Sequence, residues 1–350
     1  MPSLLQLPLR AAWRSALTPL LLALLVWWVV AWPSLTAMTS IPSVPLRAAG
    51  GGSLQMPAIG YGVGTAWFNS GGDKSKELIL SVQAALDTGF RHIDDAEMYR
   101  NEVACGQAIR EWLSRSGTKR EDLFITNKVY EVDRGCGAVC EEMAPLDCLF
   151  CSPLRFLIHS VCTRDGKPFK TSPREAWEQM MALAKTGKVK SIGVSNWRIA
   201  DLESIKDLEI QPSCNQVEAH PFLQQVGLLQ YCRKRDILVS CYGPQLPVTR
   251  NFIAGSPVEA PLLAAAERTG HTVGQVLLRW AYQTGRVPLT TSSKPERMKE
   301  YLAIFGFELT PEEVAAISTA GRRASQKRGF WQSCLDYYKE DPEMEPESQE

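Results

Sequence analysis

The chain alternates between short apolar segments and longer amphipathic segments, and this alternation restricts the fold more than any other feature. Leu78, Val82 and Leu86, for example, lie at helical spacing within residues 74–88. The apolar segments predicted to form strands are residues 59–64, 90–95, 124–128, 154–159, 189–195, 214–218, 237–242 and 287–291. Eight strands that alternate with helices pair in parallel and close into a ring, so the sequence predicts a (β/α)8 TIM barrel of the α/β class.

Capping sequences predict where several helices begin. Ser172–Glu175, Thr272–Gln275, Ser293–Glu296 and Thr310–Glu313 each combine a hydroxyl residue with a glutamate or glutamine three positions later. The first three would open barrel helices, and the last an additional C-terminal helix. A short N-terminal β-hairpin is expected ahead of the first barrel strand.

The composition favours one domain with a large core. The chain has 350 residues, of which 45% are hydrophobic. Its 38 basic and 38 acidic residues cancel, and a nucleic-acid partner would require a basic face. The ten cysteines are scattered, and a core of this size does not need bridges, so we expect reduced, unpaired thiols.

The first 37 residues differ in kind from the rest. Residues 16–35 are almost wholly apolar and follow Arg10 and Arg14, so they could span a bilayer. A cleavable secretory signal and a non-native extension ahead of Met38 are the alternatives, and the three stay open. The protein would be cytoplasmic if translation starts at Met38, and otherwise membrane-anchored or in the secretory pathway. We expect a linker at 38–55, the barrel at 56–335 and an acidic tail at 336–350.

The stretch Glu131–Pro153 interrupts the alternation, because glycine, cysteine and proline replace a clear helical stripe. Cys136, Cys140, Cys148 and Cys151 have spacings that could hold zinc. The alternative is a diverged helix whose cysteines pack as small hydrophobic residues.

Four ionisable residues follow the ends of successive predicted strands. Asp94 ends one strand, Tyr99 lies in the turn after it, and Lys128 and His159 end the next two. In a barrel these strand ends meet at one rim. A tyrosine has a pKa of about 10, which a buried lysine would lower. Taken singly, His159 could be a core histidine and Lys128 a surface lysine. Asp95 should face away from Asp94, behind the site or in solvent.

These residues and several other blocks resemble the aldo-keto reductase family. The blocks are residues 91–102, 123–128, 193–196, 215–221 and 240–244, and the resemblance extends from about Gln55 to Trp331. The local sequence is most similar to fungal family members, which are NADPH-dependent reductases of ketones and α-keto esters or amides. The resemblance implies that Tyr99 is the general acid that protonates a carbonyl oxygen as a hydride reaches carbon. Lys128 would stabilise the tyrosinate, Asp94 would hold Lys128, and His159 would orient the carbonyl.

The resemblance also implies a nicotinamide dinucleotide, and the chain has no Gly-x-Gly-x-x-Gly element of the Rossmann type after a strand. Ser195, Asn196 and Gln216 would bind the carboxamide and Tyr242 would stack on the ring, although Asn196 and Gln216 could instead cap helices. Further contacts would come from the main chain of Gly62 and Val63, and from Ser292, Ser293, Arg297 and Glu300 near the phosphates. Thr290–Ser292 stands where many members have Pro-Lys-Ser. Arg297 can still hold a 2′-phosphate, so NADPH is favoured over NADH.

The remaining expectations concern the substrate. Trp67, Tyr130, Phe222 and Trp331 are candidate walls for an apolar or aromatic carbonyl compound, with ordinary core packing as the alternative. We expect a monomer that acts on a small molecule without a metal. The competing function is a nucleotide-binding barrel that does not turn over and serves as an auxiliary or regulatory subunit. The intact set of four ionisable residues opposes it, and the altered stretch at 131–153 favours it.

Overall fold

The computed structural model describes residues 40–69, 73–143 and 155–339. The apolar segment 1–37, Cys148 and Cys151 therefore lie outside the described residues. Within the ranges that are described, every helix is too short or too polar to cross a bilayer.

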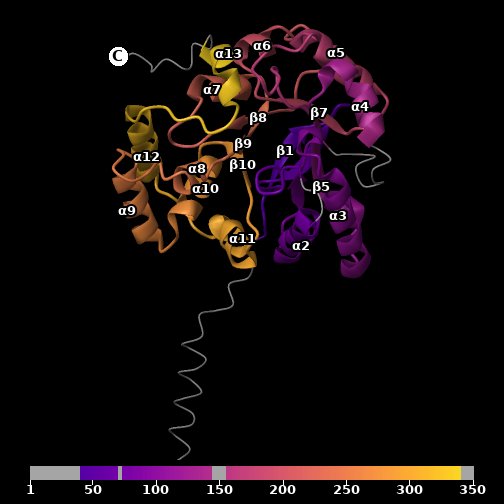
Figure 1. Cartoon of the computed structure of the whole chain (residues 1–350). Coiled ribbons are helices and arrows are strands. Elements are labelled where there is room, and N and C mark those ends of the chain that lie inside the picture. The colour runs from indigo at the N-terminus through magenta and orange to yellow at the C-terminus, as the bar shows by residue number, and fades with distance from the viewer. Residues whose placement is uncertain (1–39, 70–72, 144–154, 340–350) are drawn as a thin grey trace, which may run out of the picture. The chain divides into compact units, whose positions relative to one another are not determined.

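Eight parallel strands close into a barrel, which confirms the predicted (β/α)8 fold (Figure 1). The strands are β3 (Gly60–Gly62), β4 (His92–Asp94), β5 (Phe124–Val129), β6 (Arg155–Ile158), β7 (Ser191–Ser195), β8 (Cys214–Glu218), β9 (Leu238–Tyr242) and β10 (Arg286–Thr290). They pair in chain order, and β10 closes the ring against β3. Asp94 pairs with Thr126, and Lys128 with Leu157, so the ends of these strands meet at one rim.

Helices surround the barrel. Those between strands are α2 (Asp73–Thr88), α3 (Glu102–Ser116), α4 (Cys136–Met143), α5 (Pro173–Lys185), α6 (Ile199–Glu203), α7 (Val226–Lys234) and α10 (Val273–Gln283), and α11 (Pro295–Leu302) follows the last strand. Two more helices, α8 (Leu246–Thr249) and α9 (Glu259–Thr269), also lie between β9 and β10, and α12 (Pro311–Arg323) and α13 (Leu335–Lys339) follow α11. The sequence analysis missed α8 and α9.

Three of the four predicted capping boxes are present. Ser172, Thr272 and Thr310 each accept a hydrogen bond from the backbone N–H three residues on. The predicted cap at Ser293 is wrong, because α11 begins after Lys294 without a side-chain cap. The hydroxyl of Ser292 instead accepts the N–H of Lys294 at 3.0 Å.

The stretch predicted to be a linker forms the hairpin itself. β1 (Ser43–Arg47) pairs antiparallel with β2 (Ser53–Pro57), and Gly51 and Gly52 in the turn have φ of +90° and +82°, which glycine adopts without a steric cost. Leu46 and Met56 of the hairpin pack against residues at or near the starts of barrel strands, namely Phe124, Cys214 and Val287. The hairpin therefore covers the end of the barrel at which the strands begin, opposite the rim formed by their carboxyl ends.

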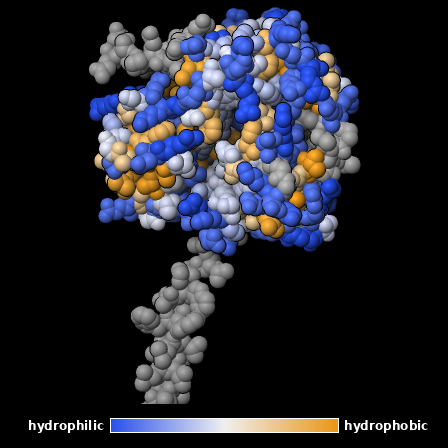
Figure 2. Space-filling view, in the orientation of Figure 1, coloured by the Kyte–Doolittle hydropathy of each residue, from blue (hydrophilic) through white to orange (hydrophobic). Residues whose placement is uncertain are grey.

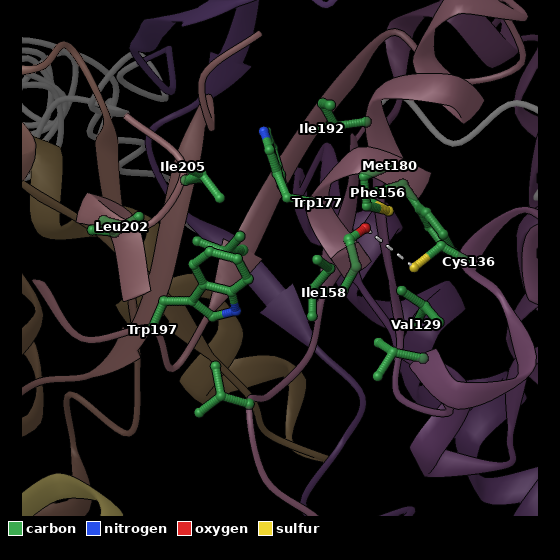
Figure 3. Close-up of a cluster of buried hydrophobic side chains, with 14 of the residues drawn as sticks. Val129, Cys136, Phe156, Ile158, Trp177, Met180, Ile192, Trp197, Leu202 and Ile205 are labelled. Atoms are coloured by element: carbon green, nitrogen blue, oxygen red, sulfur yellow. Dashed lines mark hydrogen bonds between the residues drawn. The ribbon is translucent and has the colours of Figure 1, made fainter. Parts of the chain in front are cut away.

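The interrupted stretch after Glu131 contains a regular helix, which corrects the expectation that this region breaks the barrel pattern. In α4, Cys136, Val139 and Cys140 occupy one helical face and belong to a large buried cluster. Figure 3 shows Cys136 beside Met180, and its thiol lies 3.7 Å from the carbonyl oxygen of Ala176. The interpretation of these two cysteines as small core residues is confirmed. Among the described residues, no group of three or more His, Cys, Asp or Glu could hold a metal ion.

Cys162 and Cys334 form a disulfide, so the expectation of unpaired thiols is wrong for this pair. The two cysteines are separated by 172 residues, and they meet because the C-terminal segment returns to the barrel. Residues 336–339, the first that were assigned to the acidic tail, belong to a helix. α13 extends to Lys339 beside α6 (Figure 1), where Arg198 donates to the carbonyl of Tyr337 at 2.8 Å.

The face of the molecule in Figure 2 is mostly hydrophilic, and its apolar residues form several separate patches, one of them at the lower left. The apolar side chains are gathered instead in buried clusters between the barrel and its helices.

Candidate active site

The four ionisable residues predicted from the strand ends lie together at the carboxyl rim. Lys128, fully buried, donates from Nζ to Asp94 Oδ1 at 2.5 Å and to the carbonyl oxygen of Asp95 at 2.9 Å. The same Nζ lies 3.4 Å from the hydroxyl of Tyr99. The rings of Tyr99 and His159 meet edge to face, with centroids 5.5 Å apart. A phenol, an ammonium, a carboxylate and an imidazole therefore share one small volume.

The electrostatics of this group differ in one respect from the expectation. Burial of the hydroxyl raises the pKa of Tyr99, and the charge of Lys128 offsets this only in part. The predicted net lowering is therefore wrong, and the phenol stays protonated at neutral pH. Burial acts to lower the pKa of Lys128, but Asp94 and Tyr99 outweigh it and the pKa is raised. Burial and the Lys128 charge hold the pKa of His159 well below its usual value, so this imidazole is neutral.

A pair of buried carboxyl groups lies behind the four. Asp95 is fully buried, which excludes the solvent-facing alternative. Burial and the nearby Glu102 raise its pKa well above the usual value. Burial likewise raises the pKa of Glu102 to about 7. Both groups are held largely as neutral acids at mildly acidic pH, so they add little negative charge near Lys128.

The residues predicted to bind the nicotinamide are joined to the same network. Tyr242 donates to Asn196 Oδ1 at 2.6 Å, and Asn196 donates to the hydroxyl of Ser195 at 3.1 Å. Ser195 donates to the carbonyl of Gln216 at 2.7 Å. Gln216 donates in turn to Asp94 Oδ2 at 2.7 Å. The backbone of Gln216 therefore receives the hydrogen bond from Ser195, and its side-chain amide contacts the Asp94 carboxylate.

The residues predicted to bind the phosphates lie just before α11 and within it. Ser293 and Arg297 are exposed, and Ser292 and Glu300 are partly exposed. Helix N-termini present free N–H groups to anions. At the rim, a Cβ on Gly62 would meet only the carbonyl oxygen of Thr290, at 3.9 Å. A ligand therefore has room to make the predicted approach to the backbone at Gly62. The N–H of the next residue, Val63, donates to the carbonyl of Asp94 at 3.1 Å.

The candidate pocket residues divide into two groups. Tyr130 and Trp331 face His159, with ring centroids 6.3 and 5.6 Å from the imidazole. Phe222 is 2% exposed and Trp67 is 3% exposed, and both belong to apolar clusters. For these two residues the structure favours the alternative of core packing.

A comparison with protein-family models matches the aldo/keto reductase family over residues 59–145, 157–247 and 253–322. These segments contain all four rim residues. The chain belongs to the aldo/keto reductase family.

Curated relatives and solved structures of this family extend the comparison. The NAD/NADP-dependent indole-3-acetaldehyde reductase of Schizosaccharomyces pombe is 39% identical over 282 residues, which are 79% of this chain and 95% of the relative. Glyoxal reductase of Bacillus subtilis is 36% identical over 272 residues, covering 75% of this chain and 91% of the relative. The crystal structure of a Bombyx mori aldo-keto reductase in complex with NADP superposes with a TM-score of 0.73 at 28% identity, covering 87% of this chain and 99% of that chain.

Within this aldo/keto reductase barrel, the sequence analysis missed a glycine that makes room for Tyr99. A Cβ on Gly64 would lie 2.4 Å from Cζ of the Tyr99 ring. The ring can occupy its place only because residue 64 lacks a side chain. The signal was present in the sequence as one of several glycines in residues 60–64, but nothing there singled it out.

Two buried charged residues of the family member were also missed. Arg155 is fully buried in β6, and its Nη2 lies 3.9 Å from Asp94 Oδ2. Asp94 therefore has a second cation near it besides Lys128. The two Nη atoms of Arg155 have no hydrogen-bond partner among the described residues. Glu218 is fully buried at the end of β8, and its carboxylate accepts the N–H groups of Gly329 and Phe330. The available signal for Glu218 was an acidic residue at the end of a predicted barrel strand.

Proposed function

We propose that this chain is an NADPH-dependent reductase of aldehydes and ketones in which Tyr99 is the general acid. The observation that carries the proposal is the contact series from Asp94 through Lys128 to the Tyr99 hydroxyl, at 2.5 and 3.4 Å, beside a neutral His159. A proton donor, a cation that stabilises its conjugate base and a neutral hydrogen-bond donor are the groups that carbonyl reduction requires.

The chain's own residues would perform the acid step. The bound nicotinamide would supply a hydride to the carbonyl carbon. Tyr99 would give its proton to the carbonyl oxygen, and Lys128 would stabilise the tyrosinate that remains. His159, as a neutral imidazole, can donate a hydrogen bond that orients the carbonyl. General acid catalysis contributes about 10²–10⁴ in rate, so positioning by these contacts must supply much of the rest.

The residues present fit a nicotinamide dinucleotide phosphate. Tyr242 is partly exposed beside the rim and offers a ring face for stacking, while Asn196 and Ser195 offer polar groups at the strand ends. The open backbone at Gly62 and the exposed Arg297 on the first turn of α11 fit the remainder. Arg297 favours NADPH, because a guanidinium can hold the 2′-phosphate through two hydrogen bonds. One relative carries "NAD/NADP-dependent" in its name, so the preference needs measurement.

The test is turnover by the purified full chain with NADPH or NADH and a panel of aldehydes and α-keto esters, followed by nicotinamide absorbance. Tyr99→Phe removes only the hydroxyl and should lower kcat by at least about 10²-fold. Tyr282→Phe makes the same chemical change on a ring that packs against Phe305 near the end of α10, away from the rim, and is the matched control.

Two results would contradict the proposal. Equal rates for Tyr99→Phe and the wild-type chain would remove Tyr99 from the reaction. Quenching of tryptophan fluorescence by NADPH without turnover of any carbonyl would indicate the auxiliary, nucleotide-binding barrel instead.

A further inference from the structure

The C-terminal loop from Gly329 to Cys334 carries Trp331 to the rim and is fixed on both sides of that residue. Trp331 itself has φ of +53°, a left-handed conformation that bulky residues adopt rarely. Such a conformation persists only where the surrounding structure imposes it. The contacts that impose it are therefore the contacts that place the indole beside His159.

The first anchor is the carboxylate of Glu218. It accepts the N–H of Gly329 at 2.7 Å and that of Phe330 at 3.0 Å. Phe330 packs edge to face on Tyr242, with centroids 5.5 Å apart. A Cβ on Gly329 would lie 2.2 Å from the side chain of Leu246, so this side of the loop is tightly seated.

The second anchor is the disulfide between Cys162 and Cys334. It ties the loop to the segment after β6, whose last residues lead directly to His159. In the same segment, a Cβ on Gly166 would lie 2.1 Å from the carbonyl oxygen of Ser333. The two segments are therefore in close backbone contact as well as covalently joined.

We propose that the Cys162–Cys334 disulfide is a specificity-determining clamp. Together with Glu218 it holds Trp331 against His159 and Tyr130, so that the redox state of the disulfide sets the affinity for carbonyl compounds with an aromatic substituent. This inference rests on the proposed function for its kinetic test. In the reduced protein the covalent tie between the loop and the segment after β6 is lost, while the Glu218 contacts and the Arg198–Tyr337 hydrogen bond remain. Trp331, which lies between the two anchors, can then leave its left-handed conformation more readily.

The redox step is an ordinary thiol–disulfide exchange with a dithiol. The two thiols of the reductant become its own cyclic disulfide, the S–S bond between residues 162 and 334 breaks, and each of these sulfurs gains one proton. Cys162 and Cys334 are both buried, so exchange requires the loop to open. A variant without the bond is therefore needed beside the reduced protein.

The experiment compares the full chain, before and after complete reduction with dithiothreitol and removal of the reductant, with the double variant Cys162→Ala/Cys334→Ala. Two substrates that differ only in a phenyl or a methyl group, ethyl benzoylformate and ethyl pyruvate, are assayed with NADPH. The KM for ethyl benzoylformate should rise about three- to tenfold in the reduced chain and in the double variant, the size expected for one lost aromatic contact. The KM for ethyl pyruvate should stay within about twofold by the same reasoning, and the double variant should not respond to dithiothreitol.

Amide hydrogen exchange of residues 329–338 provides a readout that does not need turnover. Exchange there should accelerate on reduction and in the double variant, even if the chain reduces no carbonyl at all. Equal exchange and equal KM values in the oxidised, reduced and double-variant proteins would overturn the clamp. Alkylation of both cysteines in unfolded, unreduced protein would overturn it as well, because the bond would then not form.

Discussion

Replacing Gly64 with alanine should displace Tyr99 from its position next to Lys128. The added Cβ would lie 2.4, 2.7 and 2.8 Å from three carbons of the Tyr99 ring. Carbon atoms without a bond approach to about 3.5 Å, so the ring or the backbone must move by about 1 Å. The hydroxyl of Tyr99 is already 3.4 Å from Lys128 Nζ, and a further displacement would break that contact.

The expected cost can be worked from this displacement. A misplacement of about 1 Å costs on the order of 10²-fold in rate, which corresponds to about 2.7 kcal/mol in the activation free energy. Overpacking also costs about 1–3 kcal/mol of folding stability, so the variant should remain folded at 25 °C. The assay is kcat for NADPH-dependent reduction, with the folded fraction followed by circular dichroism.

Gly306→Ala is the matched control, because a Cβ there meets no atom within 4 Å. It should leave kcat unchanged. If Gly64→Ala keeps the wild-type kcat while folded, the position of the Tyr99 hydroxyl does not govern the rate. The argument from ring placement would then be wrong.

Three further predictions follow from other contacts. Burial raises the Glu102 pKa from 4.5 to about 7, so Glu102 contributes up to about 3 kcal/mol to the free energy of unfolding below the unfolded pKa, and this contribution is lost as pH rises through the folded pKa. Glu102→Gln cannot titrate, so its free energy of unfolding should fall less than that of the wild-type chain between pH 4.5 and about 7. Urea unfolding at several pH values measures this, and an unchanged slope would contradict it. Glu218→Gln replaces one of the carboxylate oxygens that accept the Gly329 and Phe330 N–H groups by an amide nitrogen. It should raise KM for an aromatic α-keto ester about three- to tenfold with little change in kcat. A fall in kcat with an unchanged KM would contradict this role of Glu218. Ser172→Ala removes the side-chain cap of α5 and should lower the free energy of unfolding by about 1 kcal/mol without changing KM, as measured by chemical denaturation.

Local patterns in the sequence were sufficient for the barrel and for the four rim residues. Period and length distinguish strands from helices, and parallel strands joined by helices have few ways to close. The order of Asp94, Tyr99, Lys128 and His159 at successive strand ends was then enough to predict one cluster. Helix starts at Ser172, Thr272 and Thr310 were predictable for the same reason, because a cap is made within four residues.

Tertiary structure alone decided the contacts between segments far apart in the chain. The sequence favoured unpaired thiols, and the return of the C-terminal segment brought Cys334 to Cys162 across 172 residues. The sequence did not distinguish Gly64 from its neighbouring glycines, and its importance is evident only from the Tyr99 ring that lies against it. Trp331 and Phe222 were equal candidates for the pocket, and only the structure shows that Trp331 faces His159. The sign of the pKa shift of Tyr99 was decided in the same way. It depends on how much burial opposes the Lys128 charge, and burial is a property of the whole packed barrel rather than of any short stretch of residues.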